Sequence, residues 1–287
     1  MIKDIYLLVG GEATRLRPLS EGIPKALLTI KGKFLIDLIL KNLDKSNLEN
    51  INLICSIKHE KFWLEYKKNS QFNVNLHFEH EKLDTAGFVV QNINNFSDKF
   101  LCMNGDLLIE MNFDSFLEVA NNSKNSTICS IPVDDPSRYG VLELDGTKII
   151  NFIEKPEDMK YGNNISLGVY CLHKKDIKEI KDKLEIPCSF EKNVFPNLAG
   201  KNLLDCIIVE GNMLDVGTRE SYIYAHTENQ SNWISESAST GKNVTIENSV
   251  ILGSSSIGNN VQIKNSIICD KTIIEDGTIL YDEIIRS

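Results

Sequence analysis

Apolar and amphipathic stretches alternate along the first third of the chain. Residues 5–9, 51–56 and 74–78 are short runs rich in apolar side chains, of the length expected for buried strands. Between them, residues 34–43 and 59–68 place apolar side chains at helical spacing. This β-α-β-α-β order predicts an α/β fold with a parallel, helix-covered sheet. Ligands bind such sheets at the carboxyl ends of the strands.

The middle of the chain continues with strand-like runs. Residues 100–103 and 126–133 are rich in apolar residues, and each predicts another strand. Two more runs lie at residues 142–144 and 149–153, with Asp145-Gly146 between them. An Asp-Gly pair in this position is a strong signal for a β-hairpin.

The pattern changes after residue 240. Small and apolar residues recur about every six positions, as in residues 241–246, 257–263 and 272–279. This period is typical of a left-handed β-helix with stacked coils. Only two or three coils fit, so we expect a homo-oligomer whose contacts through the β-helix cover the open strand edges. We predict two domains, at residues 1–232 and 240–287.

Composition excludes several classes of partner. The net charge of −9 argues against non-specific nucleic-acid binding, which requires a basic face. The N-terminal apolar run of five residues is too short for a signal peptide, and no later run approaches the roughly 20 residues of a membrane span. The seven cysteines are scattered and form no C-x-x-C pair, which predicts buried, reduced thiols in a cytoplasmic protein. We therefore expect neither nucleic-acid nor membrane binding.

The end of the first strand contains the clearest chemical signal. The strand runs into Val9-Gly10-Gly11, and Thr14, Arg15 and Lys25 follow. Glycines allow the backbone to approach a ligand and its N–H groups to point at anionic oxygens. Arg15 and Lys25 add two positive charges. The spacing is neither that of a Walker loop nor G-x-G-x-x-G, and we predict a phosphate-binding loop of another kind.

Residues 9–19 (VGGEATRLRPL) and 24–28 (PKALL) resemble the signature of the sugar-1-phosphate nucleotidyltransferases. Within that family, the resemblance is to the mannose-1-phosphate guanylyltransferase-like members. The usual form is Ala-Gly-Gly-x-Gly-Thr-Arg-Leu-x-Pro-Leu, then Pro-Lys-Pro-Leu. Val9, Ala13 and Ala26 depart from it. The resemblance extends to about residue 230 and implies a Rossmann-like nucleotide-diphospho-sugar transferase fold with a mixed, mostly parallel sheet. It also implies that this loop binds the triphosphate of an NTP and that Arg15 and Lys25 are catalytic cations.

Residues 79–87 (EHEKLDTAG) are similar to the family loop that contacts the nucleobase, Glu-x-x-x-Leu-Gly-Thr-Ala-Gly. The resemblance implies that Glu79, Thr85 and Gly87 bind the nucleotide and that Glu79 meets the base. A carboxylate only accepts hydrogen bonds, and guanine offers two adjacent donors, so Glu79 favours GTP. Uracil and thymine would suit an amide better. Asp84 stands where the family has glycine.

Two aspartates match the metal ligands of the family. The strand at residues 100–103 leads to Asn104-Gly105-Asp106, which places a carboxylate at a strand end. Residues 213–218 (MLDVGT) resemble Trp-x-Asp-Ile-Gly-Thr and contain Asp215. Mg²⁺ takes one or two carboxylates together with phosphate oxygens. The resemblance therefore implies Mg²⁺ as cofactor, with Asp106 and Asp215 as ligands and Asp106 as a catalytic residue.

Further matches imply a sugar-phosphate site. Tyr139 and Gly140 would lie against the sugar, Glu154 would bind its hydroxyls, and Lys155 would hold its phosphate as a catalytic residue. Gly168 belongs to residues 164–170, similar to the strand that lines the sugar pocket. Residues 189–196 resemble Phe-Glu-x-Asp-Val-Phe-Pro, with Asn193 replacing Asp, and predict only a helix start with Ser189 as N-cap.

Three functions remain open at this point. The favoured one joins GTP and mannose 1-phosphate, although the sequence does not identify the sugar. A second is a glucose-1-phosphate thymidylyl- or uridylyltransferase. A third is a non-catalytic regulatory or sugar-nucleotide-sensing subunit, which the departures at Ala13, Asp84 and Asn193 motivate.

Overall fold

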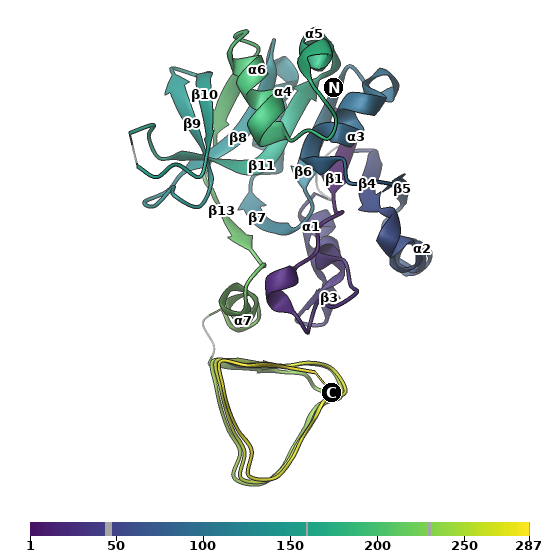
Figure 1. Ribbon diagram of the computed structural model, residues 1–287, viewed down its shortest axis with the longest axis vertical. Coiled ribbons are helices and arrows are strands. Elements are labelled where there is room, and N and C mark those ends of the chain that lie inside the picture. Colours follow the sequence, from purple (N-terminus) through teal and green to yellow (C-terminus); the bar gives the residue numbers. More distant parts are fainter. Residues whose placement is uncertain (44–47, 159, 229–230, 287) are drawn as a thin grey trace. The chain divides into compact units, whose positions relative to one another are not determined.

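The computed structural model describes residues 1–43, 48–158, 160–228 and 231–286 (Figure 1). The chain divides into two compact units, and each unit is built from two separate segments. The first unit contains Met1–Gly10 and Ile39–Met213, and the second contains Gly11–Leu38 and Leu214–Ser287. The chain therefore passes between the units at Gly10-Gly11, within the predicted phosphate-binding loop of residues 9–28, called the opening motif below.

A mixed sheet forms the centre of the first unit. Among the described residues it has nine strands, in the order β5-β4-β1-β6-β11-β8-β12-β10-β9. Neighbours from β5 to β6 are parallel, as are β8 and β12, whereas β11 runs antiparallel to both β6 and β8. The strands are β1 (Asp4–Leu8), β4 (Asn50–Ser56), β5 (Val74–Glu79), β6 (Lys99–Asn104), β8 (Ser126–Pro132), β9 (Gly140–Asp145), β10 (Lys148–Glu154), β11 (Asn164–His173) and β12 (Leu204–Ile208).

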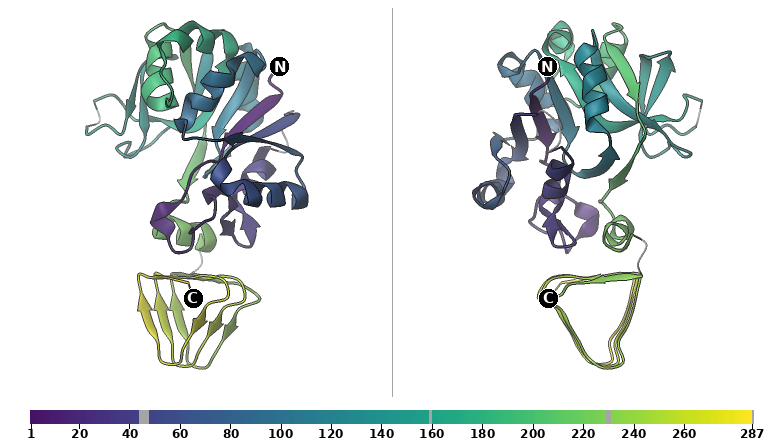
Figure 2. Two further views of the ribbon diagram at one scale, coloured as in Figure 1. Left: turned by 45° about the vertical axis from the view of Figure 1, so that its right-hand side comes forward. Right: turned by 180° about the vertical axis from the view of Figure 1, so that it is seen from behind.

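Helices cover this sheet, as the periodicity predicted (Figure 2). The β-α-β-α-β order is confirmed, because α1 follows β1 and α2 lies between β4 and β5. Tyr170 of β11 packs against Phe195 of α6, with ring centroids 4.8 Å apart, in a core that includes side chains from α3 and α5. The helices of this unit are α2 (Glu60–Asn69), α3 (Asp84–Asn92), α4 (Phe113–Asn122), α5 (Lys174–Ile180) and α6 (Phe195–Ala199), and the boundary of the units falls within α1 (Leu35–Leu43).

The strand register brings the ends of four parallel strands together. Leu8 at the end of β1 lies opposite Ile54 of β4 and Asn104 of β6. Ser56 at the end of β4 lies opposite Glu79 of β5. The residues that follow these positions therefore share the carboxyl edge of the sheet, where ligands bind in α/β folds.

Apart from its β-helix, the second unit consists of 3₁₀ turns, a short hairpin and helix α7. The 3₁₀ turns η1 (Thr14–Leu16) and η2 (Lys25–Leu27) precede a small hairpin of β2 (Thr29–Ile30) and β3 (Lys33–Phe34). Helix α7 (Arg219–Thr227) begins at a capping box made by Thr218 and Ser221. The Tyr222 hydroxyl on α7 donates to the Thr29 carbonyl oxygen at 2.6 Å and so fixes the hairpin to the helix.

The remainder of the second unit is a β-helix with a triangular cross-section (Figure 1). Its coils stack in three parallel sheets, and paired residues are 17 positions apart, as are Asn243 and Asn260. Three six-residue sides would give a coil of 18 residues, so one of the three sides is a residue shorter. The sheets are β14 (Asn232–Ile234), β17 (Ser249–Ile251), β20 (Ile267–Ile268) and β23 (Ile284–Ile285); β15 (Ser239–Thr240), β18 (Ser256–Ile257) and β21 (Ile273–Ile274); and β16 (Thr245–Glu247), β19 (Gln262–Lys264) and β22 (Ile279–Tyr281).

Two further expectations concern the whole chain. All seven cysteines are buried and free of disulfides, as predicted. Burial raises the pKa of Cys188, Cys206 and Cys269 to about 11, which makes these thiols poor nucleophiles. Within the described part of the chain, no helix has the length and apolar character needed to cross a membrane.

Candidate functional site

Three residues of the second unit form a charge cluster. Asp215 is the last residue of β13 (Gly211–Asp215), and its carboxylate lies between two cations. Lys25 Nζ is 2.6 Å from Asp215 Oδ1, and Arg15 Nη2 is 3.5 Å from Oδ2. Lys25 is only 6% exposed, whereas two thirds of the Arg15 side chain is accessible. The structure thus brings together two predicted triphosphate-binding cations and one predicted metal ligand.

Local backbone geometry makes this cluster possible. A Cβ atom at Gly217 would lie 2.8 Å from both Arg15 Nη2 and Asp215 Oδ1, so only glycine leaves room for the pair. The Lys25 N–H donates to the Gly11 carbonyl oxygen at 3.1 Å, which links η2 to the glycine pair. Ala13 is buried with φ −84°, a backbone conformation open to any residue. Its methyl group therefore does not distort the loop.

In the first unit, Gly105 holds Asp106 close to the end of β1. The Gly105 N–H donates to the Leu8 carbonyl oxygen at 3.0 Å. A Cβ atom at this position would lie 2.4 Å from Val9 Cγ1, so the turn requires glycine. The half-buried Asp106 follows in the turn between β6 and β7 (Leu107–Met111). The predicted metal carboxylate therefore lies at the carboxyl edge of the sheet.

Glu79 lies at the same edge, at the end of β5. A Cβ atom on Gly10 would come within 3.5 Å of Glu79 Oε2, so the carboxylate faces the opening motif. Burial, and then the charge of Asp84, raise the pKa of Glu79 from an ordinary 4.5 to about 7. The residue predicted to meet the base therefore changes its charge near neutral pH.

Asp84 keeps the backbone conformation of a glycine. Its φ is +64°, in the left-handed region that glycine enters freely and aspartate tolerates better than most residues. Its Oδ1 accepts the Thr85 N–H at 2.9 Å, at the start of α3. The exposed Asp84 side chain thus turns back onto its own chain, and the family loop survives the replacement of glycine.

Thr85 is hydrogen-bonded within the protein at both polar groups. Besides the bond to Asp84, its hydroxyl donates to Glu191 Oε2 at 2.8 Å and accepts the Phe190 N–H at 2.9 Å. Glu191 is a residue that the sequence interpretation missed, because residues 189–196 predicted only a helix start. That start is confirmed, since the Ser189 hydroxyl accepts the Lys192 N–H at 3.0 Å.

The residues predicted to bind the sugar phosphate also lie together in the first unit. Gly140 pairs with Glu154 across β9 and β10, and the Lys155 N–H donates to the Tyr139 carbonyl oxygen at 2.9 Å. A Cβ atom on Gly140 would lie 3.2 Å from Glu154 Oε2. Lys155 Nζ is 3.3 Å from Glu154 Oε1 and is largely exposed. A cation and a carboxylate are therefore available side by side.

Gly168 interrupts β11 next to the turn that holds Asp106. The pairing of β11 with β8 shifts register between Ser166 and Tyr170, and Gly168 has φ +70° there. A Cβ atom would lie 2.7 Å from Asn104 Nδ2. Gly168 therefore lets β11 pass closely beside the Asn104–Asp106 turn.

The two aspartates that match the family's metal ligands belong to different units, Asp106 to the first and Asp215 to the second. No group of three or more His, Cys, Asp or Glu side chains within the described residues could hold a metal alone. Asp106 and Asp215 each offer carboxylate oxygens, the ligand type that Mg²⁺ prefers. Mg²⁺ is commonly held by one or two carboxylates, with phosphate oxygens completing its shell. Each carboxylate, taken by itself, suits that mode of binding.

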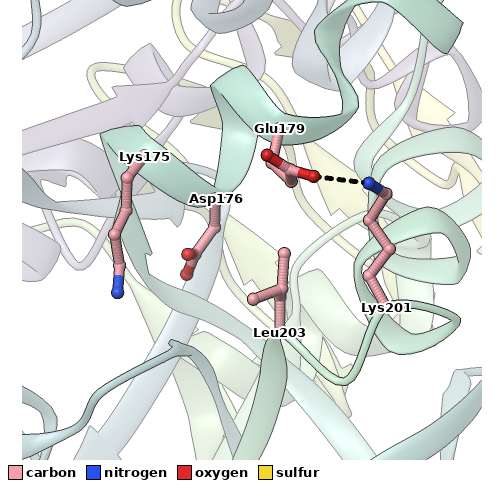
Figure 3. Close-up of a pocket in the computed structure, with 5 residues that line it drawn as sticks. All are labelled: Lys175, Asp176, Glu179, Lys201 and Leu203. Carbon is pink, nitrogen blue, oxygen red and sulfur yellow. Dashed lines mark hydrogen bonds and ion pairs between the residues drawn. The ribbon is translucent and has the colours of Figure 1, made fainter.

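A separate hollow lies at the opposite edge of the sheet. It is lined by Lys175, Asp176, Glu179, Lys201 and Leu203 and has a volume of about 390 Å³ (Figure 3). Its charges are already paired, because Lys201 Nζ is 2.7 Å from Glu179 Oε1 and Asp176 accepts two hydrogen bonds from Ser126. The predicted site residues do not line it.

Comparison with known proteins places the chain among the nucleotidyl transferases. The family model described as nucleotidyl transferase matches residues 5–232. A Sulfolobus acidocaldarius protein provisionally named a mannose-1-phosphate guanyltransferase is 34% identical over 77% of this chain. The chain spans 62% of that protein's length. Mannose-1-phosphate guanyltransferase 2 of Candida glabrata is 30% identical over 85% of this chain and 70% of its own.

Solved structures share the fold. HddC from Yersinia pseudotuberculosis, crystallised in complex with GMP-PN, aligns with a TM-score of 0.66 and 28% identity. The alignment covers 78% of this chain and 98% of HddC. The nucleotidyltransferase-like α/β fold is thereby confirmed, and the three parallel sheets near the C-terminus confirm a β-helix.

Proposed function

Since this chain belongs to the nucleotidyl transferase family, we propose that it joins an NTP and a sugar 1-phosphate into an NDP-sugar and releases pyrophosphate. The observation that carries the proposal is the cluster of Arg15, Lys25 and Asp215. A buried lysine held by a carboxylate is a preorganised positive charge, which is what a developing phosphate charge requires.

The reaction needs positioning more than covalent chemistry. An oxygen of the sugar phosphate attacks the α-phosphorus of the NTP in line, and the bond to pyrophosphate breaks. Arg15 and Lys25 neutralise the triphosphate, and Lys155 orients the attacking phosphate. Fixing two reactants in line removes much of the entropic barrier. Asp106 and Asp215 would hold Mg²⁺, which supplies further charge neutralisation when it is bound.

For the base, we propose guanine. Glu79 offers two acceptor oxygens to the adjacent N1–H and N2 amine donors of guanine. Gly10, beside Glu79 Oε2, keeps the space in front of the carboxylate open. HddC, which has been crystallised with GMP-PN, and the mannose-1-phosphate guanyltransferase relatives support this choice. We propose mannose 1-phosphate as the second substrate on the names of those relatives alone.

The geometry favours an enzyme over a regulatory subunit. The departures from the family signature leave the loops intact, because Ala13 needs no special backbone and Asp84 adopts the left-handed one. Asn193 also keeps the acceptor of the residue it replaces, since its Oδ1 accepts the Ser189 N–H at 2.9 Å. The three cations of the predicted site are present. A chain that had lost catalysis would be free to lose some of them.

We further propose a homo-oligomer through the β-helix. Outward positions on its first two coils are polar, as at Ser239 and Ser256, but the last coil has Ile273 there, 71% exposed. Likewise, Ile279 continues a column of Thr245 and Gln262. Ile279 is 57% exposed, and Ile234 on the first coil is 42% exposed, so Ile273 and Ile279 make the last coil the more apolar of the two ends.

The division into a catalytic domain at residues 1–232 and a β-helix at 240–287 stays part of this proposal. Seven thiols without disulfides agree with a reducing compartment such as the cytoplasm.

Pyrophosphate release tests the function. The purified protein with Mg²⁺ should release pyrophosphate from GTP and mannose 1-phosphate faster than from dTTP or UTP. Asp106→Asn should reduce the rate by about 10²–10³, as removal of one electrostatic group commonly does. Asp114→Asn is the matched control, because Asp114 is exposed in the first turn of α4 and is not among the predicted site residues. Turnover that is absent with every base would instead support the regulatory subunit.

A further inference from the structure

We infer that Glu191 is a positioning residue for the nucleotide, acting through the hydroxyl of Thr85 to hold the first turn of α3 at the base site. The inference rests on the proposed function, which places a nucleobase beside this turn. It assigns a role to the Glu of the Phe-Glu-x-Asp match at residues 189–196, for which the sequence predicted only a helix start.

Four hydrogen bonds join the segment 188–191 to the turn 83–86. The Cys188 N–H donates to the Leu83 carbonyl oxygen at 3.1 Å, and the Ala86 N–H donates to the Cys188 carbonyl oxygen at 3.0 Å. The Phe190 N–H donates to Thr85 Oγ1, and the Thr85 hydroxyl donates to Glu191. N–H groups in the first turn of a helix have no intrahelical partner, so this segment supplies one of the acceptors that the turn lacks.

The segment that holds Thr85 is packed into the core of the first unit. Phe190 is fully buried and packs with its ring centroid 5.5 Å from that of Phe195. It begins the π-helical turn η6 (Phe190–Val194), which Ser189 caps. Single π-helical turns are uncommon and often occur at functional sites. Because the backbone before Glu191 is held by this packing, the Glu191 carboxylate can hold the Thr85 hydroxyl in one position.

Charge explains why a carboxylate at this place matters. Burial, and then the charges of Glu154 and Asp84, raise the pKa of Glu191, whereas the Thr85 hydroxyl lowers it. Thr85 is the side chain that donates to Glu191 Oε2. The bond therefore offsets part of the cost of burying Glu191, and breaking it at either end should loosen the α3 turn, although the two backbone bonds of Cys188 to the turn remain.

Isosteric variants separate the hydrogen bond from packing. Thr85→Val keeps the shape but loses both bonds of the hydroxyl, while Thr85→Ser keeps them. Glu191→Leu removes the acceptor, while Glu191→Gln retains an acceptor oxygen. We expect Thr85→Val and Glu191→Leu each to raise the Kd for GTP about tenfold, in line with one lost bond to a charged group. For Thr85→Ser and Glu191→Gln, the Kd for GTP should stay within about twofold of the wild-type value, which corresponds to less than about 0.5 kcal/mol.

Two readouts decide the outcome. Calorimetric titration with GTP measures the affinity, and amide hydrogen exchange of residues 83–92 without nucleotide measures the order of the turn. The double variant Thr85→Val/Glu191→Leu should be no worse than Thr85→Val alone, because Thr85→Val has already removed the bond that Glu191→Leu breaks. Additive losses, or unchanged affinity in Glu191→Leu, would overturn the role of Glu191. A wild-type chain that binds GTP without turnover would overturn the proposed reaction and leave the role of Glu191 standing.

Discussion

Lys25 and Asp215 are 190 positions apart in the sequence, yet Lys25 Nζ lies 2.6 Å from Asp215 Oδ1. The lysine is buried and the aspartate is about half exposed. A charge that is removed from water must keep its partner, because an unpaired buried ammonium group is costly. The pair therefore ties the opening motif to a residue from the last quarter of the chain and presets the charge that would meet the triphosphate.

Replacing Lys25 by methionine tests this pair. We expect the pyrophosphate release rate to fall by about 10²–10³ because one preorganised charge is lost. The free energy of unfolding should fall by only about 1–2 kcal/mol, less than for a fully buried pair, since Asp215 can regain water. Activity assays and urea denaturation measure the two effects. Lys31→Met is the control, because its 2.7 Å pair with Glu228 is exposed and should contribute little.

The affinity for GTP should depend on pH through the ionisation of the Glu79 carboxyl group. Because its pKa is raised to about 7, the carboxylate gains a proton as the pH falls through 7 and loses acceptor capacity for guanine. GTP affinity should therefore fall about tenfold between pH 8 and pH 6, in proportion to the ionised fraction. Calorimetric titrations at several pH values measure this change.

Two variants check the assignment to Glu79. Glu79→Gln should flatten the pH profile, and Asp84→Asn should move it to lower pH, because the charge that helps to raise the pKa is gone. The contribution of Glu79 to the free energy of unfolding changes with pH in the opposite direction from GTP affinity. The folded chain holds this proton between the ordinary pKa and about 7, so the stability contributed by Glu79 falls as the pH rises through that window. A profile that Glu79→Gln leaves unchanged would contradict the assignment.

Gly217→Ala should separate Arg15 from Asp215. The new methyl group would lie 2.8 Å from an end atom of each side chain, and both ends can move aside. The melting temperature should therefore change little, while the KM for the NTP should rise about tenfold, equivalent to roughly 1.4 kcal/mol. Gly200→Ala, where the nearest atom would be 3.3 Å away at the end of α6, is the control. An unchanged KM would mean that the pair plays no part in nucleotide binding.

The proposed oligomer depends on the last coil of the β-helix. Ile273→Ser combined with Ile279→Gln gives that coil the residues of the coil before it, Ser256 and Gln262. We expect the variant to sediment as a smaller species than the wild type, with an unchanged melting temperature at high dilution. Thr245→Gln, on the first coil, should leave the sedimentation coefficient unchanged. Sedimentation that is identical for all three proteins would exclude this face as the interface.

Local patterns in the sequence were sufficient for much of the fold. The strands β1, β4 and β5 and the helices between them are visible as periodicity because each depends on residues within one segment. The six-residue period predicted the β-helix for the same reason. The 17-residue length of the coil was missed, although Asn248-Ser249 and Asn265-Ser266 repeat 17 positions apart, because a unit of about six residues does not show which side is shorter.

The candidate site was predicted less completely. Motif residues such as Glu154 and Lys155 do lie beside each other, but adjacency in sequence explains that. Glu191 was missed because its contact with Thr85 spans 106 positions and forms only when the sheet and helices have packed. The raised pKa of Glu79 likewise arises from burial, which a sequence motif does not show.

The split of each compact unit into two segments has a consequence during synthesis. Residues 11–38 leave the ribosome early, but their partners begin at residue 214. At a translation rate of about 5–20 residues per second, the wait is on the order of 10–40 s. Through that interval the opening motif has no Asp215 for its lysine, and the nascent chain exposes apolar residues such as Leu27 and Leu28 that are buried in the finished protein. We therefore expect a ribosome-bound intermediate in which residues 11–38 are not yet packed, and we expect chaperones to bind its exposed apolar residues.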